Sequence, residues 1–155
     1  MAGPADQSPT PKTPFWLGTA GLVPFVVIAS ALWALPEAYS PALLFWLTSY
    51  AAIVLSFIGA VHWGAAMLHP SMPEHEQGVF MTWSIVPAIV AWVTLLMPVK
   101  TGLLLLIATY VIQFAADRQF AQRFTLPAWY IRMRAGLTSV AVLCLVMALA
   151  QLARH

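Results

Sequence analysis

The chain has 155 residues, of which 61% are apolar and only 8% carry a charge. Soluble domains carry about 25% charged residues, so this composition excludes a soluble domain and indicates one compact integral membrane domain. The net charge of +2 is too small, and the basic residues are too scattered, for a surface that binds nucleic acid.

Residues 1–14 are rich in proline and polar side chains, and we expect them to form a disordered tail before a single transmembrane domain, residues 15–155. Five apolar stretches predict the transmembrane helices: Phe15–Leu35, Ala42–Leu68, Val79–Met97, Thr101–Ala116 and Ala135–Ala153. We expect the third helix to begin near Met72 and the short fourth one to continue through Asp117 to Phe120. The first stretch is too long for a signal-peptide core of about 7–15 residues, so we expect it to be retained.

The fold class follows from the lipid environment of the apolar stretches. In lipid, every backbone N–H and C=O must be bonded within the protein, which predicts an all-α polytopic bundle of five transmembrane helices. Lys and Arg residues accumulate on the cytoplasmic side of a membrane, so their positions predict the orientation. An inner N-terminus would place five of them inside and two outside: Lys12, Arg118, Arg123, Arg132 and Arg134 against Lys100 and Arg154. We therefore expect the N-terminus inside and the C-terminus outside, in a bacterial inner membrane.

The connection between the fourth and fifth predicted helices, DRQFAQRFTLPAWYIRMRAG, carries four arginines together with Trp129 and Tyr130. Basic and aromatic side chains gather where a membrane meets water. We therefore expect this connection to lie along the inner membrane surface, where its charge suits anionic lipid headgroups.

Several polar residues are expected at one depth, near the inner end of the bundle. His62 follows Pro41 by 21 residues, about 31 Å along a helix that enters from the outer side. Asp117 follows Thr101 by 16 residues, about 24 Å along another helix that enters from that side. The candidate polar residues at this end are His62, Trp63, Trp83, Asp117, Tyr130, Arg132 and Arg134.

Two interpretations of these polar residues stay open. Tyr110, Gln113 and Asp117 share one helix face, which is typical of a polar path or of hydrogen bonds between helices worth about 1 kcal/mol each. We favour hydrogen bonds for Tyr110 and Gln113. His62 is similarly either a neutral histidine bonded to a neighbouring helix or the partner of Asp117 or Tyr130 in a proton-handling or ligand-binding site.

The second predicted helix has a face of small residues, which lets another helix approach closely. Its members are Ser49, Ala52, Ser56, Gly59 and Ala60. His62 and the segment after it carry possible metal ligands within fifteen residues, without the spacing of a known metal site: His62, His69, Glu74, His75 and Glu76. We therefore expect no metal there.

Motifs for catalysis or cofactor binding are not found in the sequence. There is no serine nucleophile motif, phosphate loop or dinucleotide fingerprint. His62 has no opposing histidine within a span, which disfavours a bis-histidine haem. Cys144, the only cysteine, lies in an apolar run and allows no internal disulfide. We therefore expect no catalytic residue and no cofactor.

Two segments resemble a known family: LSFIGAVHWG (Leu55–Gly64), and the run from Asp117 through LPAWYIRMRAGLT (Leu126–Thr138). The family is that of the small polytopic membrane proteins that include mitochondrial transmembrane protein 69 and bacterial relatives. The resemblance covers the chain from roughly Pro14 to Leu149 and implies a multi-pass inner-membrane protein, mitochondrial in eukaryotic relatives. Because the family has no known function, the resemblance implies no reaction and no catalytic residue.

Three functions remain as alternatives. The first, which we favour, is a non-enzymatic accessory or assembly factor in the lipid bilayer that packs against other integral membrane proteins or against itself. The second is a small carrier or proton-linked channel with an inner-facing site around His62 and Asp117. The third is a quinone- or haem-handling redox protein, with Trp63, Trp83 and Tyr130 around His62.

Overall fold

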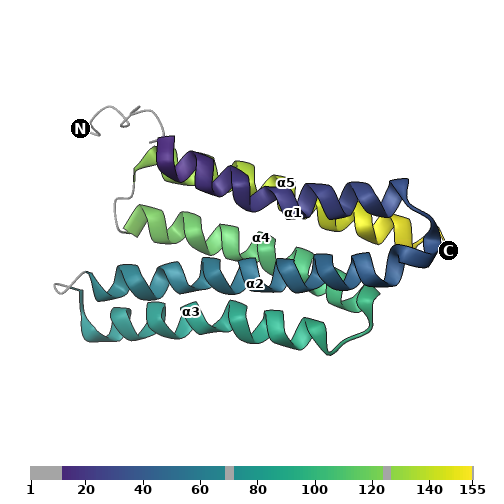
Figure 1. Ribbon diagram of the computed structural model, residues 1–155. Coiled ribbons are helices and arrows are strands. Elements are labelled where there is room, and N and C mark those ends of the chain that lie inside the picture. Colours follow the sequence, from purple (N-terminus) through teal and green to yellow (C-terminus); the bar gives the residue numbers. More distant parts are fainter. Residues whose placement is uncertain (1–11, 69–71, 124–126, 155) are drawn as a thin grey trace.

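The computed structural model describes residues 12–68, 72–123 and 127–154. In these residues the chain forms a bundle of long helices (Figure 1). The elements are α1 (Lys12–Ala34), the short 3-10 helix η1 (Glu37–Tyr39), α2 (Ser40–Met67), α3 (Glu74–Leu95), α4 (Val99–Arg123) and α5 (Ala128–Leu152). Five helices of the described chain are long and apolar enough to cross a membrane, so the predicted all-α polytopic fold is confirmed.

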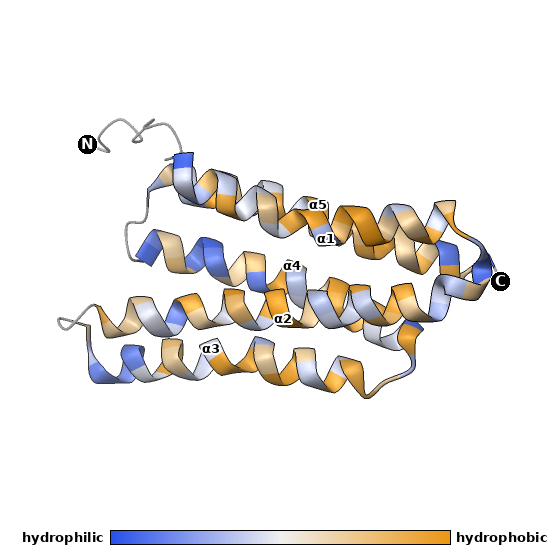
Figure 2. Ribbon diagram, viewed as in Figure 1, coloured by the Kyte–Doolittle hydropathy of each residue, from blue (hydrophilic) through white to orange (hydrophobic). Residues whose placement is uncertain are grey.

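Successive long helices run in opposite directions (Figure 1). The start of α1, the end of α2, the start of α3, the end of α4 and the start of α5 therefore share one end of the bundle, which we call the N-terminal end. Figure 2 shows that hydrophilic residues gather toward the helix ends and that the middle of the bundle is mostly apolar. This distribution suits a bundle whose middle lies in hydrocarbon.

The second helix organises the packing, since α2 contacts every other helix. On one side α2 packs against α3, and on the other side α1 and α5 lie together, with α4 in contact with α2, α3 and α5 (Figure 1). Fully buried apolar side chains such as Phe25, Leu47 and Leu103 fill the space between the helices. Large apolar side chains such as Trp16 and Trp92 cover the outside, as a lipid environment requires.

Part of the small-residue face of α2 packs against another helix of the same chain. A Cβ atom at Gly59 would lie 2.7 Å from the carbonyl oxygen of Ser84 and 3.1 Å from Cγ of Pro87, both in α3. At Gly59, the close approach expected for this face is therefore made by α3 of the same chain. Ala52 is also buried, whereas Ala60 is exposed and Ser49 and Ser56 are half-buried.

The helix boundaries differ from the predicted ones at the N-terminal end. α1 begins at Lys12, so the last three residues of the predicted tail are helical, whereas residues 1–11 lie outside the described part. α3 begins at Glu74, between the two starts that the sequence suggested. These turns are more polar than the helix interiors, and a hydropathy pattern does not separate a polar helical turn from a loop.

The prediction of a surface segment between the fourth and fifth helices is wrong. α4 continues to Arg123 and α5 begins at Ala128, so only residues 124–127 separate the two helices. The described residues of the expected surface segment are the last turns of α4 and the first turns of α5. Asp117 and Arg134 of this segment are buried and pair with each other, whereas Arg118, Arg123 and Arg132 are exposed.

Candidate functional site

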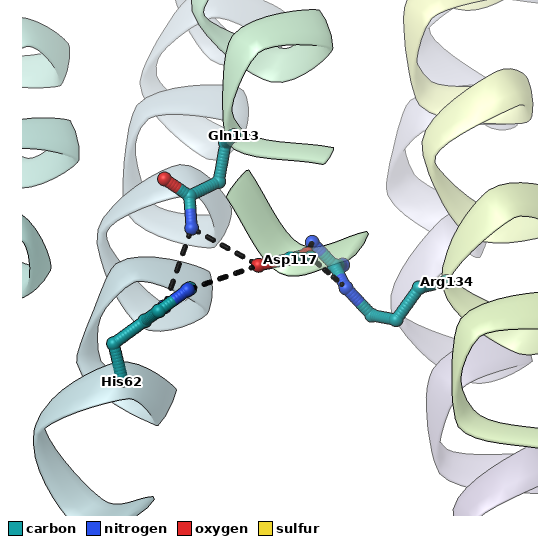
Figure 3. Close-up of polar contacts among 4 residues, drawn as sticks. All are labelled: His62, Gln113, Asp117 and Arg134. Atoms are coloured by element: carbon teal, nitrogen blue, oxygen red, sulfur yellow. Dashed lines mark hydrogen bonds and ion pairs between the residues drawn. The ribbon is translucent and has the colours of Figure 1, made fainter. Parts of the chain in front are cut away.

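Asp117 lies at the centre of a buried polar site near the end of α4, with only 2% of its surface exposed. Gln113, one turn earlier on the same helix face, donates from Nε2 to Oδ1 of Asp117 at 3.1 Å. Arg134 approaches from α5 and donates to Oδ2 from Nε at 2.8 Å and from Nη2 at 2.5 Å. Figure 3 shows the carboxylate held between these two neighbours.

His62 of α2 approaches Asp117 from the side opposite to Arg134 (Figure 3). Its Nε2 lies 3.5 Å from Oδ1 of Asp117, which is too long for a good hydrogen bond, and this buried nitrogen has no hydrogen-bond partner. Its Nδ1 lies 3.4 Å from Nε2 of Gln113. A histidine with its proton on Nε2 suits both neighbours, because Nδ1 then accepts from the amide and Nε2 faces the carboxylate.

We call His62, Gln113, Asp117 and Arg134 the polar cluster; it joins α2, α4 and α5. The negative charge of Asp117 and the positive charge of Arg134 compensate each other within it. Charges that are buried without such a partner cost several kcal/mol each. The cluster is therefore a neutral unit with hydrogen-bonding groups, enclosed by apolar helices.

The structure thus brings together three of the predicted site residues: His62, Asp117 and Arg134. It adds Gln113, which the sequence analysis interpreted as a link between helices; its spacing of four residues from Asp117 was the available signal. Tyr130 lies one turn before Arg134 on α5. Its hydroxyl group lies within electrostatic range of the charges of Arg134 and Asp117.

The other predicted site residues lie apart from the cluster. Trp63 and Arg132 are exposed. Trp63 directly follows His62, and Arg132 precedes Arg134 by two positions, so each points away from its helix in a different direction from the buried cluster residue. Trp83 is half-buried on α3, where its indole N–H is buried without a hydrogen-bond partner. Tyr110 donates its hydroxyl to the backbone oxygen of Ala51 at 2.9 Å, which links α4 to α2.

Arg134 also belongs to the wall of a cavity of about 690 Å³ between α1, α2 and α5, which we call the lateral cavity. Most of its lining is apolar. Leu17, Ile53 and Phe57 are among the lining residues and are 70%, 65% and 74% exposed, so the cavity opens sideways between helices toward the lipid. The polar cluster therefore reaches a lipid-facing cavity through Arg134.

Residues 10–150 match the family described as "Protein of unknown function (DUF3429)". The chain belongs to this family. It is also 37% identical over 136 residues to Transmembrane protein 69 of Xenopus tropicalis, in an alignment that covers 88% of the chain and 53% of that relative. The chain thus spans about half the length of the relative. No solved structure matches the chain.

The predicted family resemblance is therefore confirmed. In this DUF3429 protein, the two segments that carried the resemblance contain His62 and Arg134, which the fold brings to either side of Asp117 (Figure 3). The name of the relative states that it is a transmembrane protein and nothing about an activity.

The loop before α3 offers little to a metal ion in the described residues. His69 lies outside them, and Glu76 is engaged by Arg123, which donates from Nε to Oε2 at 3.2 Å and from Nη2 to Oε1. Across residues 12–68, 72–123 and 127–154, no group of three His, Cys, Asp or Glu side chains lies close enough to hold a metal. In this DUF3429 protein, the site consists of hydrogen bonds and an ion pair between side chains of three helices.

Proposed function

We propose that this protein binds a membrane-soluble ligand, an apolar molecule with a polar head, in the lateral cavity. The observation that carries the proposal is the position of Arg134, which is part of the buried polar cluster and of the wall of a mostly apolar cavity. A cavity of about 690 Å³ is in the range of small-molecule sites, which are mostly apolar with a few polar contacts.

The energetics of lipid support this proposal. A charged side chain within a membrane is costly and is typically paired or functional. Asp117 compensates the charge of Arg134 but lies outside the lining of the cavity, so a ligand in the cavity would meet the guanidinium from the other side. Asp117 thus holds Arg134 in place for a second contact.

A path across the whole membrane has less support from the packing. Beyond the polar cluster, toward the other end of α4, the side chains of Leu103 and Leu106 are fully buried, and Leu47 and Leu145 are equally enclosed on α2 and α5. An apolar core of this kind favours a binding site on one side of the membrane over a carrier or channel with a continuous polar path.

Photolabelling with a matched pair of glycine variants tests the proposal. Gly21 lines the cavity, and a Cβ atom there meets nothing within 4 Å, so Gly21→Leu fills the cavity without a clash at the backbone. Gly136 of α5 is exposed, has the same free space and does not line the cavity, so Gly136→Leu is the control. The probe is a diazirine-bearing fatty alcohol, which is neutral, in vesicles that contain the purified protein.

We expect label on α1 and α5 peptides that line the cavity in the wild type and in Gly136→Leu, and at least a fivefold loss in Gly21→Leu. Equal labelling of Gly21→Leu and the wild type, with both variants folded, would contradict the proposal. So would label spread evenly over the lipid-facing surface.

The accessory role is the second candidate, favoured by the sideways opening of the cavity, which a helix of a partner protein could cover. Leu17 lies in the opening, whereas its neighbour Trp16 is equally exposed and lies outside it. A photoreactive benzoylphenylalanine at each position, introduced in the native membrane, separates the roles. One protein captured in stoichiometric amounts from position 17 and not from position 16 would support the accessory role.

For location, we propose the bacterial inner membrane, with the N-terminal end of the bundle facing the cytoplasm. Support comes from the basic residues, since Lys12, Arg123 and Arg134 all lie toward that end. Lys100, by contrast, lies at the start of α4, at the opposite end. An excess of Lys and Arg is typical of the cytoplasmic side.

A further inference from the structure

One buried threonine differs from the other buried threonines of the described chain. Thr48, Thr94 and Thr109 each donate their hydroxyl to a backbone oxygen three or four residues earlier in their own helix. The Oγ1 atom of Thr138 is buried without any hydrogen-bond partner, and only 7% of this residue is exposed. Thr138 lines the lateral cavity. Its Oγ1 is enclosed in this structure, and rotation of the side chain about the Cα–Cβ bond would turn the hydroxyl toward a group inside that cavity.

Thr138 belongs to a row of polar side chains along one face of α5. Tyr130, Arg134 and Thr138 are spaced by four residues, over about 12 Å, and all three line the cavity. Two hydroxyl groups and a guanidinium, which has five N–H donors of which two point to Asp117, make this face rich in donors. A ligand with acceptor atoms suits such a face.

The charge balance favours a neutral ligand head. Among the described residues, Arg134 is the one charged residue that lines the cavity, and Asp117 already compensates it. A phosphate or carboxylate in the cavity would add an uncompensated negative charge in a medium of low dielectric constant, which is costly. A carbonyl oxygen accepts from the same donors without that cost.

Three aromatic residues that contact one another are among the lining of the cavity. The ring of Phe25 meets the rings of Tyr50 and Tyr110 edge-on, with centroids 5.2 and 6.3 Å away, and all three residues line the cavity. Aromatic walls favour a flat ring, which gains from edge-to-face and offset contacts.

The length of the cavity suits one apolar chain. Its lining on α1 extends from Pro14 to Phe25, about 16 Å along the helix. This is close to half of the hydrocarbon thickness of about 30 Å, the depth of one leaflet. A chain that starts inside the cavity leaves through the opening beside Leu17, Ile53 and Phe57 into that leaflet.

From these contacts we infer that the ligand is an isoprenoid quinone, a neutral flat ring with two carbonyl acceptors on an apolar chain. The ring lies between these aromatic residues and the α5 row, with its carbonyl oxygens accepting from Thr138 and Arg134. This inference rests on the proposed function and concerns binding alone.

A ring-labelled probe tests the inference. The purified protein is placed in vesicles of quinone-free lipid and illuminated with a short-chain quinone that carries an azide on its ring. We expect label on the cavity-lining parts of α1 and α5, displaced by decylubiquinone and not by equal amounts of decanoic acid or phosphatidylglycerol. Displacement by all three competitors alike would overturn the inference.

Threonine variants identify the contact. Thr138→Val keeps the shape and removes the hydroxyl, and we expect it to weaken decylubiquinone binding about fivefold, as loss of one hydrogen bond does. Thr138→Ser keeps the hydroxyl and is expected to bind as the wild type does. Thr109→Val is the matched control, because its hydroxyl bonds within α4 and lies outside the cavity lining. Wild-type affinity in a folded Thr138→Val would also overturn the inference.

The two proposals fail in different ways. If the fatty-alcohol probe labels the cavity and Gly21→Leu blocks it, but the quinone probe does not label it, the cavity binds a ligand and the quinone inference is wrong. If neither probe labels the cavity, the proposed function and the inference fail together.

Discussion

Arg134 donates twice to the same oxygen of Asp117: Nε and Nη2 both contact Oδ2, and Oδ1 is left to Gln113 and His62. The two oxygens of one carboxylate thereby serve different helices, α5 on one side and α2 on the other (Figure 3). Asp117 thereby bonds to α5 and faces His62 of α2 toward the N-terminal end of the bundle.

The first prediction concerns the charge pair. Arg134→Met leaves the carboxylate of Asp117 buried without a counter-charge, and we expect it to lower the free energy of unfolding by about 3 kcal/mol. Asp117→Leu likewise leaves the guanidinium of Arg134 buried without a counter-charge, and we expect a similar loss. The measurement is unfolding of the purified protein by SDS in mixed micelles, followed by circular dichroism.

The double variant Asp117→Leu/Arg134→Met is the control for this prediction. Replacement of both charges by apolar side chains removes the unpaired charge, so we expect it to recover most of the stability lost in either single variant. If each single variant costs less than about 1 kcal/mol, the pair is as weak as an ordinary polar contact between membrane helices.

The second prediction ranks His62 below Arg134. His62→Phe keeps a ring against Phe120, whose centroid lies 4.4 Å from that of the imidazole, and removes both ring nitrogens. Asp117 keeps its contacts with Gln113 and Arg134, so we expect a loss of about 1 kcal/mol, the value of one hydrogen bond. The same SDS titration checks this prediction. A loss as large as that of Arg134→Met would show that His62 contributes more to the stability of the cluster than its geometry indicates.

The depth of the site in the membrane could be predicted from the sequence, whereas the side chains that meet in it could not. A constant rise of 1.5 Å per residue places His62 and Asp117 at one level without any knowledge of neighbours. The direction of each side chain around its helix depends on where the other helices pack. Trp63, next to His62, points outward for this reason, and Arg132 lies on another side of α5 from Arg134.

Thr138 shows a second limit of sequence analysis. Most buried threonines of the described chain satisfy their hydroxyl within their own helix, and nothing in the sequence separates Thr138 from Thr109. Only the packing of α1 and α2 around α5 reveals that its hydroxyl is unpaired beside a cavity. The helices follow from local chemistry, whereas the charged pair and the cavity follow from the arrangement of the helices.

The third prediction concerns the contact between α2 and α3. A Cβ atom at Gly59 would lie 2.7 Å from the backbone oxygen of Ser84, so Gly59→Ala forces the two helices apart and we expect a loss of about 1–3 kcal/mol. Gly64 lies in the same helix, and a Cβ atom there would meet nothing within 4 Å, so its replacement serves as the control. We expect Gly64→Ala to be neutral or slightly stabilising, because alanine favours a helix. Equal effects of the two substitutions on SDS unfolding would contradict this packing.

The last prediction concerns orientation. Cys144 is buried and is the only cysteine, so Cys144→Ala gives a background in which single new cysteines report on the two ends of the bundle. Gln122 is exposed near the end of α4, and Met97 is exposed in the turn between α3 and α4, at the opposite end. In intact bacterial cells, a membrane-impermeant maleimide should label Met97→Cys and reach Gln122→Cys only after the membrane is opened, since the basic N-terminal end is expected to face the cytoplasm. The reverse pattern would place the polar cluster and the lateral cavity in the outer leaflet.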